Sequence, residues 1–415
     1  MSVNRRQKSH LSLFAVPFYL WLGWIGLCLQ PLVFWPSATI PHEVPKVWAT
    51  IAGVMGIGFT LMVMLRRRPM PAITFHLPLL LAVMTFFSVA VLSSLLGEDI
   101  HKSVIGNPYR IDGLLTLSVL IAASLLISFW QTSQWRKYFV WSMWSGAGLV
   151  STWAVIDFVR LHVLNMESVY NWQGAIGVSF GQPNFLAGYL LCCLPLGWYL
   201  YRVADTQLVK GGVVLTLVIL ILALLGTYSL GAIAGLGVAT CLLYILTKDY
   251  SPVWGLGTIL LAALLFNTIA IWKDQTTAIA ESRTRIFKHV STGYLAQPVF
   301  GWGVANVDYA FRYSALREGF YHDVYLDKAH SELLEVLVTT GVVGLISYSL
   351  LLGVAYLQLV KQTRKANATD RVWYQMLMLC FLLYVYHSQT NVISISEHLI
   401  FWFVVGAVLI EQKAS

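Results

Sequence analysis

Two apolar runs follow one another in the middle of the chain, GVVLTLVILILALLGTY over residues 212–228 and GAIAGLGVATCLLYILT over residues 231–247. Neither run contains a charged residue, and each is close to the roughly 20 apolar residues that a helix needs to cross a bilayer. Because lipid offers no hydrogen-bond partners to the backbone, a spanning segment of this kind must be helical. The stretch therefore predicts two transmembrane helices joined by a short reversal at Ser229 and Leu230.

Composition extends this conclusion to the whole chain of 415 residues, which is 58% hydrophobic and only 11% charged. Soluble domains carry roughly 25% charged residues, so a soluble fold is excluded. Applied along the sequence, the same length criterion predicts helices near residues 12–35, 46–65, 77–96, 114–130, 138–159, 184–201, 212–228, 231–247, 252–272, 331–360, 373–387 and 398–410. We therefore expect an all-α polytopic membrane protein of about twelve spans, forming a single domain over residues 1–415.

The distribution of the basic residues argues against a nucleic-acid partner, although the formal net charge is +8. The 27 Lys and Arg residues form short clusters between apolar runs, whereas nucleic-acid binding needs a basic stripe. Basic residues gather in the cytoplasmic loops of membrane proteins. With both termini in the cytoplasm, 16 of the 27 fall on that side, four in short outer loops and seven in the segment 273–329. We expect this topology, with residues 273–329 forming one long outer loop.

The long loop carries a compact basic cluster in the stretch Glu281-Ser-Arg-Thr-Arg-Ile-Phe-Lys-His289. Connections of this length usually have a function of their own. Arg283, Arg285 and Lys288 suit a diphosphate, because arginine offers planar paired donors to phosphate oxygens and keeps its charge. The anionic headgroups of membrane lipids suit the cluster equally well. We expect the loop to carry part of an active site.

A second polar stretch, Asp327-Lys-Ala-His-Ser-Glu-Leu-Leu-Glu335, leads into the predicted helix 331–360. The ordinary pKa of histidine, about 6.5, allows His330 to take a proton from a sugar hydroxyl at neutral pH. Asp327, Glu332 or Glu335 could orient its ring. The alternative is a capping cluster, since acidic side chains are favoured at helix N-termini.

A third stretch, Gly177-Val-Ser-Phe-Gly-Gln-Pro-Asn-Phe-Leu-Ala187, places two amides directly before a predicted span. Gln182 and Asn184 could bind sugar hydroxyls or a lipid phosphate. As an alternative, Asn184 simply caps the helix that follows. Four further polar residues lie near the same end of the last two spans, where a polar helix interface explains them equally well: His387, Asn391, Glu397 and His398.

Several familiar chemistries leave no motif in this chain. A phosphate-binding Gly-x-x-x-x-Gly-Lys-Ser/Thr loop, His-Glu-x-x-His and Asp-x-Asp are all missing from the sequence. The five cysteines fall inside apolar runs without Cys-x-x-Cys spacing. A metal-dependent or nucleotide-dependent enzyme is therefore disfavoured, and we expect no metal site and no cofactor.

Taken in order along the chain, these stretches resemble the O-antigen ligase and O-antigen polymerase family of bacterial membrane glycosyltransferases. The resemblance rests on five elements: Phe-Gly-Gln-Pro-Asn-Phe-Leu-Ala at 180–187, Arg283-x-x-x-Phe287-Lys288, Pro298-Val-Phe-Gly-Trp-Gly303, Asp327-Lys-Ala-His-Ser331 and Phe401-Trp-Phe-Val-Val-Gly406. The chain departs from the family pattern in three places. Leu230 stands where many relatives have an arginine, Phe287 where tryptophan is usual, and Ser331 where asparagine is usual.

The resemblance implies a GT-C-like helical enzyme in the bacterial inner membrane, with its active site on the periplasmic face. It implies a donor glycan linked to undecaprenyl diphosphate, a lipid or glycan acceptor such as lipid A-core, and contacts with membrane lipids. His330 is then the general base and Arg283 the principal diphosphate ligand. Residues expected to bind substrate are Arg285, Lys288, Gln182, Asn184, Glu332 and Asp327. Polymerase and protein O-oligosaccharyltransferase activities stay open, and a lipid or glycan transporter is the alternative of another class.

Overall fold

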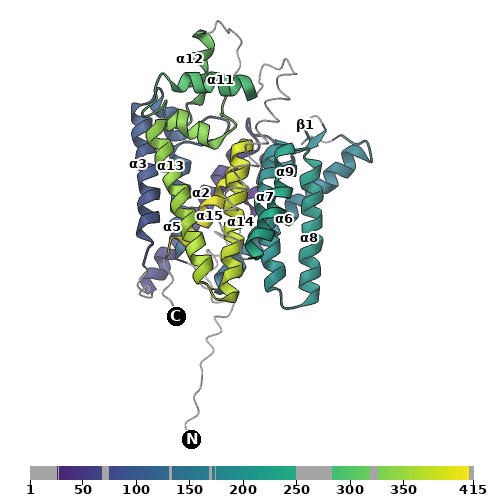
Figure 1. Ribbon diagram of the computed structural model, residues 1–415. Helices are drawn as coiled ribbons and strands as arrows, with labels where there is room; N and C mark the ends of the chain where they lie inside the picture. Colours follow the sequence, from purple (N-terminus) through teal and green to yellow (C-terminus); the bar gives the residue numbers. More distant parts are fainter. Residues whose placement is uncertain are drawn as a thin grey trace.

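The computed structural model describes residues 26, 28–67, 74–129, 133–167, 171–172, 174–248, 283–317 and 326–410. Almost all of the regular structure in these residues is helical (Figure 1). The elements are η2 (Gln30–Leu32), α2 (Glu43–Arg67), α3 (Leu77–Leu96), α4 (Ile100–Ile105), α5 (Leu114–Ser128), α6 (Ser133–His162), β1 (Asn171–Trp172), β2 (Ala175–Ile176), η3 (Val178–Phe180), α7 (Pro183–Val203), α8 (Gln207–Gly226), α9 (Leu230–Thr247), α11 (Arg283–Tyr294), α12 (Val307–Arg317), α13 (Glu332–Lys365), α14 (Ala368–Thr390) and α15 (Ile395–Val408). β1 and β2 form one small antiparallel hairpin.

Seven of these helices are long and apolar enough to cross a membrane: α2, α3, α6, α7, α8, α9 and α13. Two shorter apolar helices, α5 and α15, lie among them. The chain is therefore a polytopic helical membrane protein, as the composition predicts. The expected span 252–272 and most of the span 12–35 lie outside the described residues, so the count of twelve stays a prediction.

Helix starts follow local sequence. α3 and α7 each have proline in their first turn, where its missing N–H costs nothing. α15 begins with a capping box, in which the side chains of Ser394 and Glu397 each accept from the other's backbone N–H. The N-cap of α7 is Gln182, so the alternative reading of Asn184 as the cap is wrong.

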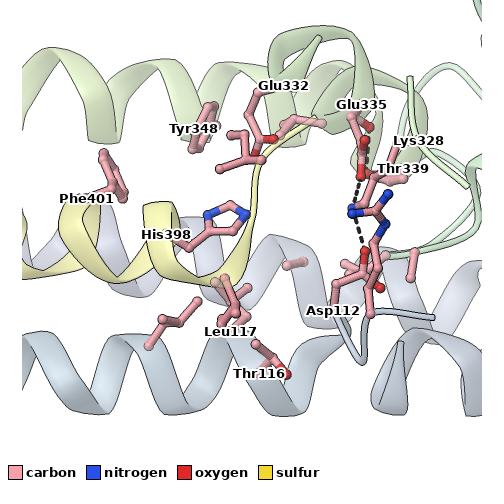
Figure 2. Close-up of a pocket in the computed structure, with 18 of the residues that line it drawn as sticks. Asp112, Thr116, Leu117, Lys328, Glu332, Glu335, Thr339, Tyr348, His398 and Phe401 are labelled. Atoms are coloured by element: carbon pink, nitrogen blue, oxygen red, sulfur yellow. Dashed lines mark hydrogen bonds and ion pairs between the residues drawn. The ribbon is translucent and has the colours of Figure 1, made fainter. Parts of the chain in front are cut away.

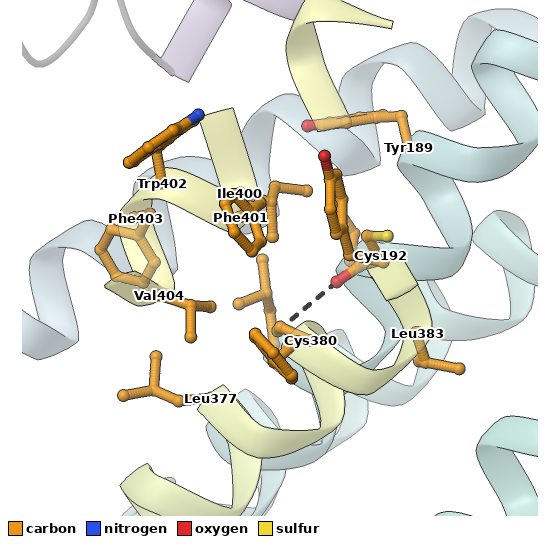
Figure 3. Close-up of a cluster of buried hydrophobic side chains, with 14 of the residues drawn as sticks. Tyr189, Cys192, Leu377, Cys380, Leu383, Ile400, Phe401, Trp402, Phe403 and Val404 are labelled. Carbon is orange, nitrogen blue, oxygen red and sulfur yellow. Dashed lines mark hydrogen bonds between the residues drawn. The ribbon is translucent and has the colours of Figure 1, made fainter. Parts of the chain in front are cut away.

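The centre of the bundle is built from α7, α14 and α15. Tyr189 and Cys192 of α7 pack with Cys380 of α14 and Phe401 of α15 (Figure 3). The Sγ of Cys380 lies 3.5 Å from the backbone oxygen of Cys192. Tight packing of this kind fixes the helix ends that carry the polar residues described below.

The segment 273–329, expected as a long loop, is helical over much of its described part. α11 and α12 lie together over one end of the bundle (Figure 1), which we call the α11 end. They enclose a separate small core, in which Ile286, Val290, Trp302 and Phe311 are buried against Val338 of α13. The segment is thus packed directly onto α13.

α13 is interrupted at Gly341, which has φ of 69° and ψ of −173°. The loop 298–303 fills the interruption with backbone hydrogen bonds. Trp302 N donates to Val338 O at 3.0 Å, and Val342 N donates to Pro298 O at 2.9 Å. Backbone groups freed by the break are in this way satisfied within the protein, as a membrane helix requires.

Candidate functional site

Two adjoining cavities open at the α11 end of the bundle. The larger has a volume of about 130 Å³ and is bounded by α2, α3, α5, α13, α14 and α15 together with the turns before α5 and α13. The smaller, of about 10 Å³, lies next to it. Both are lined by Lys328, Glu332, Glu335, Ile393 and His398. Glu332 of α13 and His398 of α15 point into the larger cavity (Figure 2).

One wall of the larger cavity is a cluster of buried charges. The Nζ of Lys328 lies 2.5 Å from Asp112 Oδ2 and also contacts Glu335 Oε1 (Figure 2). The Nε of Arg110 lies 2.6 Å from Asp327 Oδ2. These ion pairs tie the turn before α5 to the segment that carries His330.

The pKa values in this cluster reflect mutual stabilisation of the charges. Burial alone would raise the pKa of Asp112, but Lys328 and Arg110 outweigh it and lower that pKa. Burial alone would lower the pKa of Lys328, but Asp112 and Glu335 outweigh it and raise that pKa. Asp112 and Lys328 are therefore both charged at neutral pH and face each other as an ion pair.

Two side chains that line the larger cavity retain hydrogen-bonding capacity. Glu43 Oε2 accepts from Ile395 N at 3.1 Å, whereas Oε1 is buried without a hydrogen-bond partner among the described residues. Arg110 Nη1 is likewise buried without such a partner, while its guanidinium lies 4.8 Å from the centre of the Phe185 ring. Since unsatisfied buried polar atoms are costly, this cavity suits a polar ligand.

His330 lines the smaller cavity, and its backbone is in the left-handed region with φ of 58°. This conformation is unfavourable for a residue with a Cβ, and it is typically held in place by its surroundings at functional sites. The next residue, Ser331, donates from Oγ to Gln389 Oε1 of α14 at 3.0 Å. The histidine is thereby fixed between the charge cluster and α14.

Arg283, the first residue of α11, reaches the same place. Its Nη2 lies 3.2 Å from Asn391 Oδ1, and Asn391 lines the smaller cavity together with His330. Behind Asn391, His387 Nε2 lies 3.3 Å from the amide nitrogen, and His387 Nδ1 lies 2.7 Å from Glu397 Oε2. The structure thus places Arg283 against Asn391, which lines the smaller cavity together with His330.

The remaining candidates are distributed around this centre. Glu332 lines both cavities, and Asp327 is paired with Arg110. Four others line neither cavity: Arg285, Lys288, Gln182 and Asn184. The first two follow Arg283 on α11, where Arg285 is half-buried and Lys288 is exposed.

No sequence motif indicates a role for Arg110, Asp112 or Glu43, and a polar helix interface explains His387 and Asn391 in the sequence as well as a functional role does. A usable signal existed for the first two. The turn Arg110-Ile-Asp112-Gly113 places two opposite charges directly before an apolar run. A turn needs no charged residues to be soluble, so this pair of charges indicates an ion-pair partner or a ligand. Asn391 gave no such signal for its contact with Arg283, which lies 108 positions away in the sequence.

Within the part of the chain that the structure describes, no group of three or more His, Cys, Asp or Glu residues could hold a metal ion. The charged atoms of the cluster instead face one another as ion pairs.

Residues 215–349 match the model of the O-antigen ligase family. The matched range runs from α8 to the first half of α13, so it includes Arg283, Asp327, His330 and Glu332. A search of curated proteins finds no match to the chain.

Proposed function

Since the match over residues 215–349 assigns the chain to the O-antigen ligase family, we propose that it is a membrane glycosyltransferase of the O-antigen ligase type. It would move a glycan from undecaprenyl diphosphate to an acceptor hydroxyl. The observation that carries the proposal is the meeting at Asn391, which lines a cavity with His330 and accepts from Arg283 at 3.2 Å. A base and a cation are available there at one place.

In the proposed reaction, His330 takes the proton of the acceptor hydroxyl while the hydroxyl oxygen attacks the anomeric carbon. The bond between that carbon and the diphosphate oxygen breaks, and the diphosphate leaves with the electron pair. Arg283 binds the diphosphate, with Arg285 and Lys288 as supporting cations, where negative charge grows in the transition state. A single displacement of this kind inverts the anomeric centre, and it needs no metal or nucleotide because the leaving group is already activated.

The larger cavity is the proposed place for the reacting sugar. Its wall offers the carboxyl groups of Glu332 and Glu43 as hydrogen-bond partners for sugar hydroxyls, and the aromatic rings of Tyr384 and Trp402 as apolar faces. Asp327 acts there through its ion pair with Arg110. For Gln182 and Asn184, which line neither cavity, we propose contacts with more distant parts of the glycan or lipid.

We propose the bacterial cytoplasmic membrane as the location, with both termini inside and the α11 end facing the periplasm. The distribution of Lys and Arg supports this topology. We propose lipid A-core, or an equivalent surface glycolipid, as the acceptor. Cysteine labelling from each side of spheroplasts tests the topology, since Lys288→Cys should react from outside and Lys365→Cys only after permeabilisation.

The function is tested by incubating the purified full chain with undecaprenyl-diphosphate-linked oligosaccharide and one acceptor at a time, followed by mass analysis. Lipid A-core, a second lipid-linked repeat and an acceptor protein separate ligase, polymerase and protein-glycosylating activities. We expect glycan on lipid A-core, no product from a folded His330→Ala variant, and strongly reduced but measurable product from a folded Arg283→Ala variant. Transport of intact donor across proteoliposomes without bond cleavage would instead support the transporter alternative.

A further inference from the structure

Arg283 is held by a line of three buried side chains that extends away from the cavity into the bundle. Glu397 Oε2 lies 2.7 Å from His387 Nδ1, and both residues are fully buried. His387 Nε2 lies 3.3 Å from Asn391 Nδ2, and Asn391 is 4% exposed. Asn391 Oδ1 then accepts from Arg283 Nη2 at 3.2 Å.

The donor and acceptor properties of these groups fix the direction of every link. A carboxylate can only accept, so His387 must carry its proton on Nδ1 and donate it to Glu397. At the other end, Arg283 can only donate, so Asn391 turns its oxygen toward Arg283 and its NH₂ group toward His387 Nε2, which must therefore accept.

The far end of this line is itself immobilised. Glu397 Oε1 accepts from Ser394 N at 3.3 Å in the capping box of α15. On the other side, Gly188 of α7 leaves room for the pair, because a Cβ there would lie 2.1 Å from His387 Cε1 and 2.4 Å from Glu397 Oε2. The side chains of Glu397 and His387 are thus fixed by α15 and α7. Through its hydrogen bond to Asn391, His387 in turn restrains the Asn391 amide.

We propose that Glu397, His387 and Asn391 form a positioning network that sets the orientation of the Arg283 guanidinium next to the cavity that Asn391 and His330 line. The inference rests on the proposed function, in which Arg283 binds the diphosphate of the donor. In this network Asn391 is a positioning residue, because it acts on the substrate through Arg283. His387 differs in role from His330, since its two nitrogens are both committed inside the protein.

The test compares Asn391→Leu with Asn391→Asp in transfer from undecaprenyl-diphosphate-linked oligosaccharide by the purified full chain. Leucine removes the acceptor for Arg283, and we expect kcat/KM for the donor to fall about 10- to 100-fold, the range for a hydrogen bond to a charged group. Aspartate keeps an acceptor facing Arg283, so we expect it to retain more activity than leucine. A space-filling role predicts the reverse order, since burying a carboxylate costs more than burying leucine.

A matched control is Gln375→Leu, which removes a buried amide hydrogen bond of 2.8 Å to Leu246 O near the other end of α14. We expect its donor kcat/KM to stay within about 2-fold of wild type, because it leaves the network intact. A double-mutant cycle completes the test: in an Arg283→Ala background, Asn391→Leu should have no further effect on transfer.

The outcomes separate the two proposals. An inactive wild-type chain overturns the proposed function. An active wild type in which Asn391→Leu behaves like Gln375→Leu, or in which its effect persists undiminished without Arg283, overturns the network alone. If Asn391→Leu fails to fold, Asn391→Asp decides, because its activity must then exceed that of the Arg283→Ala variant.

Discussion

Replacement of Lys328 by methionine probes the charge cluster most directly. The Nζ of Lys328 contacts Asp112 at 2.5 Å and Glu335, and the lysine side chain is only 15% exposed. Breaking a buried ion pair from one side costs about 3–5 kcal/mol, because it leaves the partner charge buried and unpaired. Since Asp112 also feels the charge of Arg110, we expect Lys328→Met to lower the free energy of unfolding by about 3 kcal/mol at pH 7.

The pH dependence of this loss has a definite sign. In the wild type the pKa of Asp112 is lowered, so its contribution is present above the ordinary aspartate pKa and is lost only in acid. The raised pKa of Lys328 keeps its contribution complete up to the ordinary lysine pKa. Without Lys328, burial is opposed only by Arg110 and the backbone N–H of Asn107, and we expect the pKa of Asp112 to rise above its ordinary value. The variant should therefore lose stability as the pH rises, and its deficit against wild type should shrink toward acid pH.

The assay is equilibrium unfolding in mixed micelles of increasing SDS fraction, followed by tryptophan fluorescence at several pH values. Lys365→Met, at the exposed end of α13, is the matched control. The double variant Lys328→Met/Glu335→Gln removes one of the two unpaired carboxylates and should recover about 1–2 kcal/mol of the loss. Equal stability of Lys328→Met and Lys365→Met at pH 7 would refute the reasoning.

Three further predictions concern the backbone and the chemistry. The His330→Gly variant should be about 1 kcal/mol more stable than His330→Ala, because glycine tolerates the φ of 58°. Both variants should lack transfer activity. Equal unfolding midpoints of the two variants would show that the backbone at residue 330 is not strained. Gly341→Ala should lower the free energy of unfolding by more than about 2 kcal/mol, because its Cβ would lie 2.0 Å from Val299 O. Gly353→Ala in the same helix is the control: its Cβ would meet no atom within 4 Å, so the free energy of unfolding should stay equal or rise slightly. Transfer should persist in excess EDTA, and strict dependence on added divalent ion would contradict the proposed mechanism.

The sequence predicts local features of the fold well. The expected helix 77–96 coincides with α3 (Leu77–Leu96), because proline at its start and Gly97 at its end act within one turn. The break inside α13 was not predictable in the same way. Glycine at 341 permits the break, but the loop 298–303 supplies the hydrogen bonds that satisfy it.

In the candidate site, too, the features that depend on single residues can be predicted from the sequence, and the contacts between distant residues cannot. His330 and Arg283 stand out as residue types suited to glycosyl transfer, and their chemistry can be read without knowing their neighbours. The ion pair between Arg110 and Asp327 joins residues 217 positions apart, and the contact between Arg283 and Asn391 joins residues 108 positions apart. A single sequence carries no signal for such pairings, because nothing local to either residue depends on the other.

The interruption of α13 at Gly341 has a consequence for exchanging parts between related enzymes. The loop 298–303 supplies backbone donors and acceptors to the break, and a Cβ on Gly301 would lie 2.5 Å from the backbone of Thr339. The loop and the helix pack closely at two glycines, Gly301 on the loop and Gly341 on α13. A chimera that takes the α11–α12 segment from one parent should therefore fold only if the first half of α13 comes from the same parent.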